Sequence, residues 1–347
     1  MMERFDRAQL NFFKYNFKSP LKFKDHTLSE KEGYFLNLFD QRKKRGIGEL
    51  SPLKGFSKKD LPQLKIELEK NLFYIIDTPF KVDDIDFKKP FFNLFKAPTV
   101  INSNVLFCIE GAILSWLETT HAKLLQNFFK LKNFNFAVPL NGLLIGEEKD
   151  LDKTIEEWSS AGLTSIKVKI GRKSIKEELA LIWNIYKKSH GKITLRLDAN
   201  QNFDSEDFRF FAKNLPLKII DYIEDPIPNF HQLDQAITGL KIPIAIDENI
   251  LEHKDRITPF VKTWVIKPSL VGGYSKAVEL IEEAAKRKIK TVISSSFETN
   301  LSLKYLALLA KHQNDFAETP CGLDTFRYFI DDKSDTQPYI KEGNIHF

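Results

Sequence analysis

The 347-residue chain has few of the residues on which disulfide-bonded and zinc-binding proteins depend. Its two cysteines, Cys108 and Cys321, lie far apart and have no CxxC partner. Neither a disulfide framework nor a zinc site is therefore indicated. The seven histidines show no metal-binding or catalytic-triad spacing. We expect a reduced, cytoplasmic protein, because disulfides persist mainly in oxidising compartments.

The sequence also lacks an apolar run of the ~18 residues that a membrane-spanning helix needs. Its first ten residues carry charges of both signs and no apolar core, which argues against a signal peptide. The 52 basic and 47 acidic residues are interleaved, so the net charge of +5 does not favour nucleic acid. We expect neither a membrane nor a nucleic-acid partner, and both a monomer and a homo-oligomer stay open.

Short β-rich runs alternate with amphipathic helical patterns from about residue 136 onward. Strands that recur with helices between them pair in parallel through right-handed crossovers. The predicted strands are residues 136–144, 164–170, 192–199, 218–225, 242–248, 262–268 and 290–296. The pattern predicts an α/β protein in which residues 132–320 close into a β/α barrel.

The rest of the chain follows other patterns. Residues 1–100 contain short lysine-rich runs with prolines and predict an α+β capping domain. Residues 101–131 read as one amphipathic helix that links the cap to the barrel. Residues 321–347 mix turn and strand signals, and we expect them to pack back on the barrel and the cap.

Charged residues stand at the ends of successive predicted strands. Lys167 and Lys169 are two positions apart, so on a strand they share one face. The later strand ends carry Asp198, Glu224, Asp247 and Lys267. Because the carboxyl ends of parallel barrel strands surround one rim, where barrel enzymes do their chemistry, we expect these side chains to meet there.

Three carboxylates in one barrel mouth would repel one another unless a hard cation lay between them. Oxygen ligands suit Mg²⁺, or Mn²⁺ as a substitute, better than zinc. A lysine beside such a metal and a second lysine has a lowered pKa, so it can take the α-proton of a carboxylate substrate. The metal and the other ammonium would stabilise the resulting ene-diolate.

This ring of residues resembles the enolase superfamily, which combines a lysine or histidine base with Mg²⁺. Within it, five motifs are similar to the o-succinylbenzoate synthase family: GIGELSPLKGFS (46–57), LRLDAN (195–200), IKPSLVGG (266–273), VISSSFET (292–299) and GLDT (322–325). The resemblance implies a modified (β/α)7β barrel of the TIM type with an N-terminal cap. It also implies a lyase of menaquinone biosynthesis that dehydrates a dicarboxylate, 2-succinyl-6-hydroxy-2,4-cyclohexadiene-1-carboxylate, to o-succinylbenzoate.

The resemblance assigns Mg²⁺ to the three strand-end acids and the α-proton to Lys169. Lys267 would remain cationic and stabilise the ene-diolate, and Lys167 would tune Lys169 and help to hold the carboxylate. Asp225 follows Glu224 where a second glutamate is common in the superfamily, which affects only the surroundings of the ligand.

The same resemblance suggests residues that contact substrate: Arg196, Asn200, Gly272, Gly273, Ser294, Ser295 and Ser296. Backbone N–H groups of the three serines would receive the succinyl carboxylate. The two glycines would let the backbone approach the substrate. For Arg196, a structural ion pair inside the barrel is an equal alternative.

Two segments of the cap resemble lid loops. The members of the first are Gly46, Glu49, Ser51, Pro52, Gly55, Phe56 and Ser57. For Glu49 a structural role is at least as well supported as a role in the lid. The second segment covers residues 20–32, and its His26 could touch substrate.

Three alternatives remain open. A superfamily N-acylamino acid racemase or dipeptide epimerase would use the paired lysines as two bases. The region 318–325 lacks the Asp-x-Asp that holds a dipeptide ammonium, which favours dehydration. A non-catalytic metal-binding scaffold would be expected to lose a member of the ring, and none is missing. A Schiff-base aldolase using Lys169 or Lys267 would not need the three acids.

Overall fold

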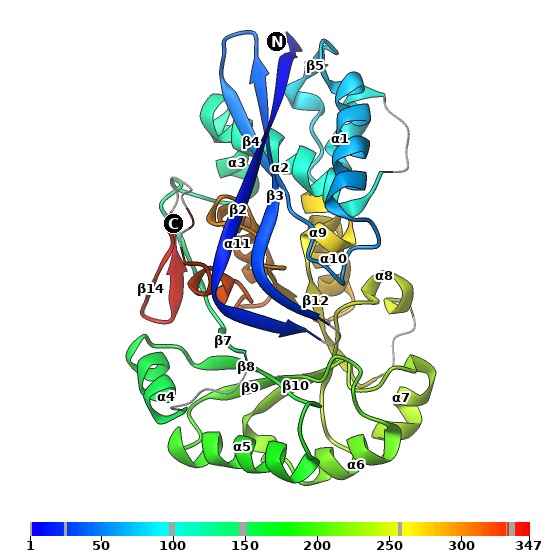
Figure 1. Ribbon diagram of the computed structural model, residues 1–347, viewed down its shortest axis with the longest axis vertical. Helices are drawn as coiled ribbons and strands as arrows, with labels where there is room; N and C mark the ends of the chain where they lie inside the picture. Colours follow the sequence, from blue (N-terminus) through cyan, green and yellow to red (C-terminus); the bar gives the residue numbers. More distant parts are fainter. Residues whose placement is uncertain are drawn as a thin grey trace.

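A curled parallel sheet forms the base of the protein (Figure 1). The computed structural model describes residues 2–23, 26–96, 101–145, 151–255, 259–330, 332 and 337–347. The sheet strands, in spatial and chain order, are β7 (Gly142–Leu144), β8 (Ser165–Lys169), β9 (Thr194–Asp198), β10 (Ile220–Glu224), β11 (Ile244–Ile246), β12 (Val261–Ile266) and β13 (Lys290–Ile293). Each lies within a predicted strand or, for β12, within one residue of it. The first predicted strand divides into β7 and a separate β6 (Ala137–Pro139).

Helices follow these strands along the chain, and the first four lie along the outer side of the sheet (Figure 1). The helices are α4 (Leu151–Ser160), α5 (Ile175–Lys188), α6 (Ser205–Lys213), α7 (Phe230–Ile237), α8 (Ile250–His253), α9 (Pro268–Val271), α10 (Gly273–Lys286) and α11 (Asn300–Asn314). Their starts follow capping rules: Ser174 and Glu177 form a capping box before α5, and Asp204 caps α6. The fold is therefore an α/β barrel of the modified TIM type with an added cap.

The C-terminal segment returns to the edge of the barrel. Isolated parallel bridges join Cys321 to Leu140 and Gly322 to Ser294, so this segment lies between the two ends of the sheet. The hairpin of β14 (Tyr339–Lys341) and β15 (Asn344–His346) then pairs antiparallel with β6. The bridge between Phe329 and Phe17 reaches the cap. These contacts agree with the expected return of residues 321–347.

The cap is built on a long antiparallel hairpin. Its elements are β1 (Met2–Glu3), β2 (Phe5–Phe23), β3 (His26–Asp40), β4 (Arg45–Leu50), α1 (Leu61–Ile75), β5 (Phe80–Lys81) and the 3₁₀ helices η1 (Val82–Asp84) and η2 (Phe91–Phe95). In its described part, the expected lid segment at residues 20–32 is not a loop but continues β2 and β3 toward the barrel (Figure 1), and its role as a lid stays a prediction. The lysines and turn-forming residues of this segment hid the strand pattern in the sequence. The side chain of His26 lies outside the described residues.

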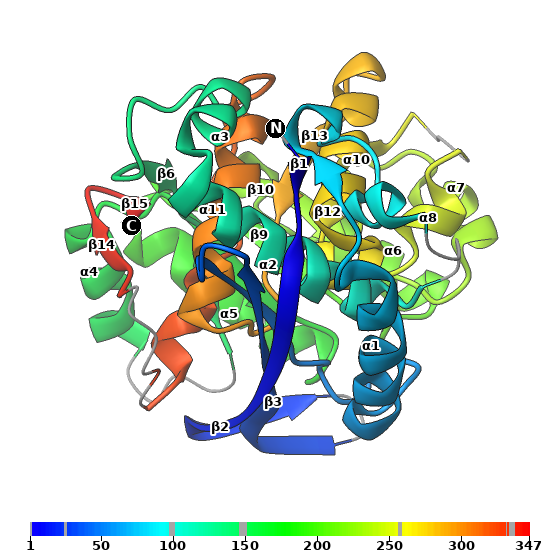
Figure 2. The same ribbon diagram turned by 90° about the horizontal axis from the view of Figure 1, so that it is seen from above.

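Two helices replace the single linking helix expected at residues 101–131. They are α2 (Ser103–Thr120) and α3 (Ala122–Phe128), and they separate at His121, whose φ of −136° and ψ of 43° are not helical. Helix α2 lies beside the cap strands near the middle of the molecule (Figure 2). The other 3₁₀ helices are η3 (Leu217–Ile219) and η4 (Asp324–Tyr328). No helix in the described ranges is both long and apolar enough to cross a membrane.

Glycines let β4 pack directly on α2. A Cβ atom would lie 1.9 Å from the Cys108 carbonyl oxygen at Gly48 and 2.1 Å from the Ala112 carbonyl oxygen at Gly46. The assignment of Gly46 to a lid loop was therefore wrong, because it is a packing residue within a strand.

We expect Gly48→Ala to destabilise the protein by about 3 kcal/mol, because the added methyl group meets backbone atoms that cannot move aside. Gly239→Ala is the control. Nothing lies within 4 Å of its Cβ position, and its φ of 79° alone should cost about 1 kcal/mol. Urea denaturation measures both variants, and equal midpoints would contradict the close packing.

Candidate active site

The register of the sheet brings the predicted charged residues to one edge. Lys169 is the lateral partner of Asp198, and Asp198 is the partner of Glu224. Asp247 directly follows the strand β11, and Lys267 directly follows β12. All five therefore stand at the carboxyl ends of neighbouring parallel strands, as the spacing predicts.

Two lysines neutralise the buried acids. The Nζ atom of Lys167 lies 3.0 Å from Asp198 Oδ2 and 2.8 Å from Glu224 Oε1, and the ammonium of Lys267 pairs with Asp247. Burial opposes both charges, but Asp198 and Glu224 hold the pKa of Lys167 well above its usual value. In the same way Asp247 outweighs burial and raises the pKa of Lys267. Both side chains are therefore cationic near neutral pH.

Lys169 differs from these two lysines. Burial lowers its pKa, and the positive charges of Lys167, Arg172 and Lys267 lower it further, against the opposing effect of Asp198. Lys169 therefore gives up its proton more readily than its two neighbours. A lysine of this kind can act as a general base.

The acids also differ from one another. Burial acts to raise the pKa of Asp198, but Lys167 and Lys169 outweigh it and lower the pKa to about 2. Burial raises the pKa of Glu224 well above its ordinary value. Asn200 Nδ2 donates to Asp198 Oδ1 at 2.5 Å and holds that carboxylate in place.

Asp225 stands where a second glutamate is common in the superfamily. It supports the backbone around Asp247. It accepts hydrogen bonds from the backbone N–H groups of Asp247 (3.4 Å) and Glu248 (3.2 Å). Burial raises the pKa of Asp225 to about 7. The residue thus orients its neighbours instead of extending the ring of acids.

The donor set suits a hard cation. Within the described ranges, no three acidic, histidine or cysteine side chains stand in ready metal-ligand geometry, because ammonium groups lie between the carboxylates. Glu224 Oε2, however, is buried without a hydrogen-bond partner among these residues. A buried carboxylate oxygen in that state carries a large desolvation cost, which a cation would relieve. Asp198, Glu224 and Asp247 together supply only oxygen ligands, as Mg²⁺ prefers.

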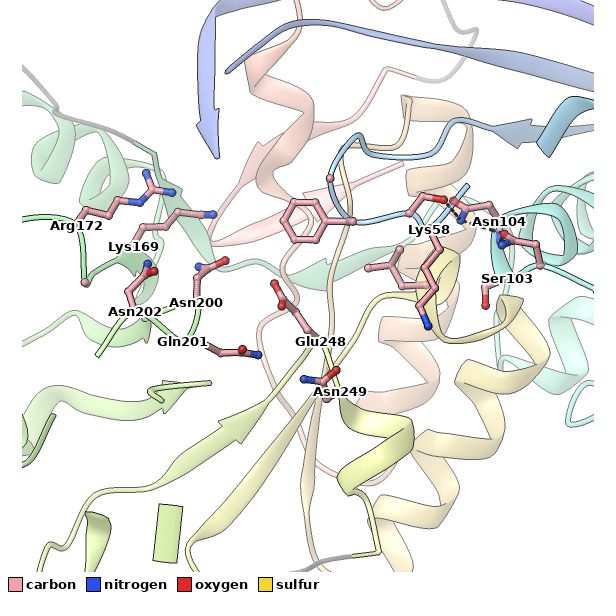
Figure 3. Close-up of a pocket in the computed structure, with 16 residues that line it drawn as sticks. Lys58, Ser103, Asn104, Lys169, Arg172, Asn200, Gln201, Asn202, Glu248 and Asn249 are labelled. Atoms are coloured by element: carbon pink, nitrogen blue, oxygen red, sulfur yellow. Dashed lines mark hydrogen bonds between the residues drawn. The ribbon is translucent and has the colours of Figure 1, made fainter. Parts of the chain in front are cut away.

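Two adjoining cavities open onto the ring. The inner cavity has a volume of about 60 Å³ and is lined by all three lysines. The outer cavity, of about 890 Å³, is shown in Figure 3. Lys169 and Arg172 lie on one side of it, Lys58 lies on the other, and Glu248 lies between them. Phe56, Lys169 and Asn200 line both cavities. An excess of cations at the entrance favours an anionic ligand.

Comparisons with known proteins identify the family. Residues 150–347 match the family model described as Enolase C-terminal domain-like, which covers more than half of the chain. The chain belongs to the enolase superfamily. Residues 5–83 match the model described as MenC, N-terminal domain.

Several relatives of the chain are o-succinylbenzoate synthases. The enzyme of Aliivibrio salmonicida is 28% identical over 316 residues, which cover 88% of this chain and 86% of the relative. The enzyme of Pasteurella multocida is also 28% identical over 316 residues, covering 88% and 85%. Among solved structures of the superfamily, a dipeptide epimerase from Enterococcus faecalis complexed with Mg and L-Leu-L-Tyr has a TM-score of 0.83. It is 18% identical and covers 100% of this chain and 97% of its own, which shows the shared fold.

The serines expected to offer backbone N–H groups already use them. The N–H of Ser294 donates to Ile266 O at 2.9 Å, that of Ser295 to Gly322 O at 3.0 Å, and that of Ser296 to Glu298 Oε2 at 2.6 Å. The expected role of these N–H groups in binding a carboxylate was therefore wrong. The three serines do line the inner cavity, and Ser296 Oγ is buried without a partner among the described residues.

Other expected substrate contacts have structural partners. Arg196 is buried, and it donates to Asp221 Oδ2 at 3.0 Å and to Pro320 O at 2.7 Å, as its alternative interpretation predicts. Gly273 was expected to face the substrate cavities, but it does not. A Cβ atom on it would lie 2.4 Å from Glu110 Oε2, and both Gly272 and Gly273 have positive φ at the junction of α9 and α10. These glycines thus shape a helix junction.

The described lid loop is shorter than expected. Glu49 lies in β4, and its carboxylate accepts from Ser51 Oγ at 2.5 Å and from Thr299 Oγ1 at 2.7 Å. The assignment of Glu49 to the lid was therefore wrong, whereas Ser51 follows the end of β4 and its place in the lid stays a prediction. The loop proper runs on through Pro52, and Gly55, Phe56 and Ser57 line the outer cavity. The ring of Phe56 lies 5.6 Å from Lys267 Nζ.

Sequence reasoning missed two buried residues behind the inner cavity, Lys31 and Glu298. Lys31 lies in the segment that we interpreted as a lid loop. Glu298 lies within the motif VISSSFET, where no pattern in the sequence indicated a chemical role for it. No local pattern pointed to Lys31, because extending the Leu36 and Leu38 alternation backward along the strand places Lys31 on the opposite face.

The protonation of buried Glu110 should make the stability of the protein depend on pH. Burial raises the pKa of Glu110 to about 7, from an ordinary value of 4.5. The folded state therefore holds this proton more tightly than the unfolded state. The resulting stabilisation is complete below pH 4.5 and is lost as the pH rises through 7, by roughly 3 kcal/mol.

Glu110→Gln removes this titration, so its stability relative to the parent protein should rise between pH 5 and pH 8. Urea denaturation at several pH values measures the difference. Glu69→Gln, at an exposed ion pair, is the control and should not change the slope. Parallel curves for Glu110→Gln and the parent protein would contradict the raised pKa.

Proposed function

We propose that this chain is a Mg²⁺-dependent o-succinylbenzoate synthase. Its substrate would be the dicarboxylate 2-succinyl-6-hydroxy-2,4-cyclohexadiene-1-carboxylate, and its setting would be menaquinone biosynthesis in the cytoplasm. One observation carries the proposal: a lysine with a lowered pKa, Lys169, and a cationic lysine, Lys267, line the same cavity beside three carboxylates. The named relatives and the N-terminal family match support the choice of reaction.

Lys169 takes the α-proton in the first step. Its neutral amine abstracts the proton from the carbon that bears the ring carboxylate, and the C–H electron pair moves into the carboxylate as an ene-diolate. The ammonium groups of Lys267 and Lys167 stabilise the added negative charge. The chemistry that bound Mg²⁺ supplies, with Asp198, Glu224 and Asp247 as its ligands, is Lewis-acid stabilisation of the carboxylate.

The second step returns the proton. Lys169, now an ammonium, donates it to the departing hydroxyl group, the C–O bond breaks, and the electron pair completes the aromatic ring. One water leaves for each substrate, and no oxidant is needed. A single group on one face can serve both steps, which corresponds to a syn elimination.

The inner cavity suits a ring with polar groups at its edge. Leu53, Leu143, Ile145 and Phe297 provide apolar wall, and Ser296 Oγ, which has no partner in the described part of the chain, offers a hydrogen bond. We propose that the ring binds here and that Asn200 contributes by fixing Asp198.

A dipeptide epimerase is the second candidate, since such an enzyme shares the fold. Asp324 argues against it. This acid is buried, accepts from the Leu143 N–H at 3.0 Å and pairs with Arg327. It is therefore committed to structural contacts and does not present a carboxylate to a substrate ammonium.

Lys169→Ala and Lys267→Ala should each lower kcat by at least ~10³-fold, because each removes a group that acts in the transition state. Ultraviolet absorbance follows the conversion of the cyclohexadiene to the aromatic product. Lys262→Ala, at an exposed lysine of the strand β12 that precedes Lys267, is the control and should keep parental activity. Parental rates in the Lys169 variant would refute its role as the base, and a covalent adduct after borohydride treatment with a keto substrate would favour the aldolase.

Mg²⁺ should raise the melting temperature of the parent protein, because a ligand that binds only the folded state stabilises it. EDTA should reverse both this shift and the activity. Glu224→Gln should lose the thermal shift, since a neutral amide is a weaker ligand than the carboxylate. Differential scanning fluorimetry with and without MgCl₂ measures it, and Glu252→Gln, at a residue outside the ring, is the control. An unchanged shift in Glu224→Gln would exclude this residue as a ligand.

A further inference from the structure

A buried lysine of the cap contacts the wall of the inner cavity. Lys31 of β3 is only 2% exposed, and its Nζ donates to the Ser296 carbonyl oxygen at 3.1 Å. Ser296 lines the inner cavity together with Lys167 and Lys267. An ammonium taken out of water costs several kcal/mol unless it is paired, so this position requires compensating charge.

Two buried carboxylates supply that charge. Burial lowers the pKa of Lys31, and the charges of Glu298 and Glu49 oppose this effect. Glu298 Oε2 accepts from Ser295 Oγ at 2.7 Å and from the Ser296 N–H at 2.6 Å. Its other oxygen accepts from Ser269 Oγ at 2.6 Å, two residues after Lys267. One carboxylate thus ties the cavity wall to the helix that follows Lys267.

The residue after Ser296 needs such support. Phe297 has a φ of 61°, a left-handed conformation that is unfavourable for a residue with a side chain. Its ring lines the inner cavity and meets Phe17 of the cap edge to face, with ring centroids 5.5 Å apart. Lys31 holds the carbonyl of the preceding peptide, and Glu298 holds the N–H of Ser296.

We propose that Lys31 is a positioning residue, which with Glu298 holds the strained turn at Ser296 and Phe297 and so sets the affinity of the inner cavity for substrate. Lys31 acts through the wall, not on the reacting atoms. The cap therefore contributes to substrate binding from behind the wall as well as through its loop at Phe56. The prediction for affinity rests on the proposed function.

Lys31→Met keeps the length of the side chain and removes its charge and hydrogen bond. We expect KM to rise ~10-fold with kcat within ~3-fold of the parent value, because the wall loosens while Lys169 and Lys267 keep their places. Lys14→Met is the matched control. Lys14 lies on the paired strand β2, and its ion pair with Glu30 is solvent-exposed, so KM should stay within ~2-fold.

Glu298→Gln tests the charge pairing. The amide can keep a hydrogen bond to each neighbour, so the substitution mainly removes the charge that faces Lys31. In the double variant Lys31→Met/Glu298→Gln, KM should rise less than the product of the two single effects. Lys31→Met alone leaves the Glu298 carboxylate without its cation, and the double variant no longer contains that carboxylate. Lys31→Arg, which keeps the charge, should restore part of the affinity.

Amide hydrogen exchange gives a readout that does not depend on the substrate. In Lys31→Met the Ser296 amide should exchange at least ~10-fold faster than in Lys14→Met, because the turn opens locally. If the parent protein does not convert the cyclohexadiene, the proposed function fails and the exchange experiment still decides on Lys31. Unchanged exchange of the Ser296 amide in Lys31→Met would overturn the positioning role. In an active enzyme, a lower melting temperature of this variant with an unchanged KM would overturn it as well.

Discussion

The site depends on balancing charges that burial would otherwise make unfavourable. Parallel pairing forces Asp198, Glu224 and Asp247 together at the carboxyl ends of neighbouring strands. Three carboxylates in a low-dielectric space repel one another, so each needs a cation or a proton. Lys167 and Lys267 supply two ammonium groups, and an oxygen of Glu224 is still without a partner among the described residues. A divalent cation bound at this edge would relieve the same imbalance that makes the edge costly.

The cap contributes to this edge in two ways. Its loop brings Phe56 to the boundary between the two cavities, close to Lys267. Its strands bring Lys31 and Glu49 into contact with the segment from Ser296 to Thr299, behind the inner wall. Both contacts require β4 to lie tightly against α2, which its glycines allow. The packing of the cap and the shape of the binding cavity are therefore linked.

Periodicity made the barrel and its ring predictable. A buried parallel strand is mostly apolar, so a charged residue where it ends stands out, as Asp198 and Lys267 do. Contacts that join distant segments leave no such trace. The glycine pair at residues 272–273 has the composition of a ligand-binding turn, but its partner is Glu110, a residue over 160 positions away. The backbone N–H groups of Ser294 and Ser295 likewise donate to distant segments, as the closure of the barrel dictates, and no local pattern specifies these bonds.

Lys167 and Lys169 show how position alone can separate two identical side chains. They share a strand face, yet Lys167 has acids on two neighbouring strands within 3.0 Å, and its proton is held tightly. Lys169 stands one step nearer the rim, where burial and the surrounding cations outweigh the attraction of Asp198. A lysine with a lowered pKa and a lysine with a raised pKa thus arise from one Lys-Val-Lys sequence. Exchanging their roles would require moving the acids by two residues along their strands, which would keep them on the same face but carry them past the rim of the cavity.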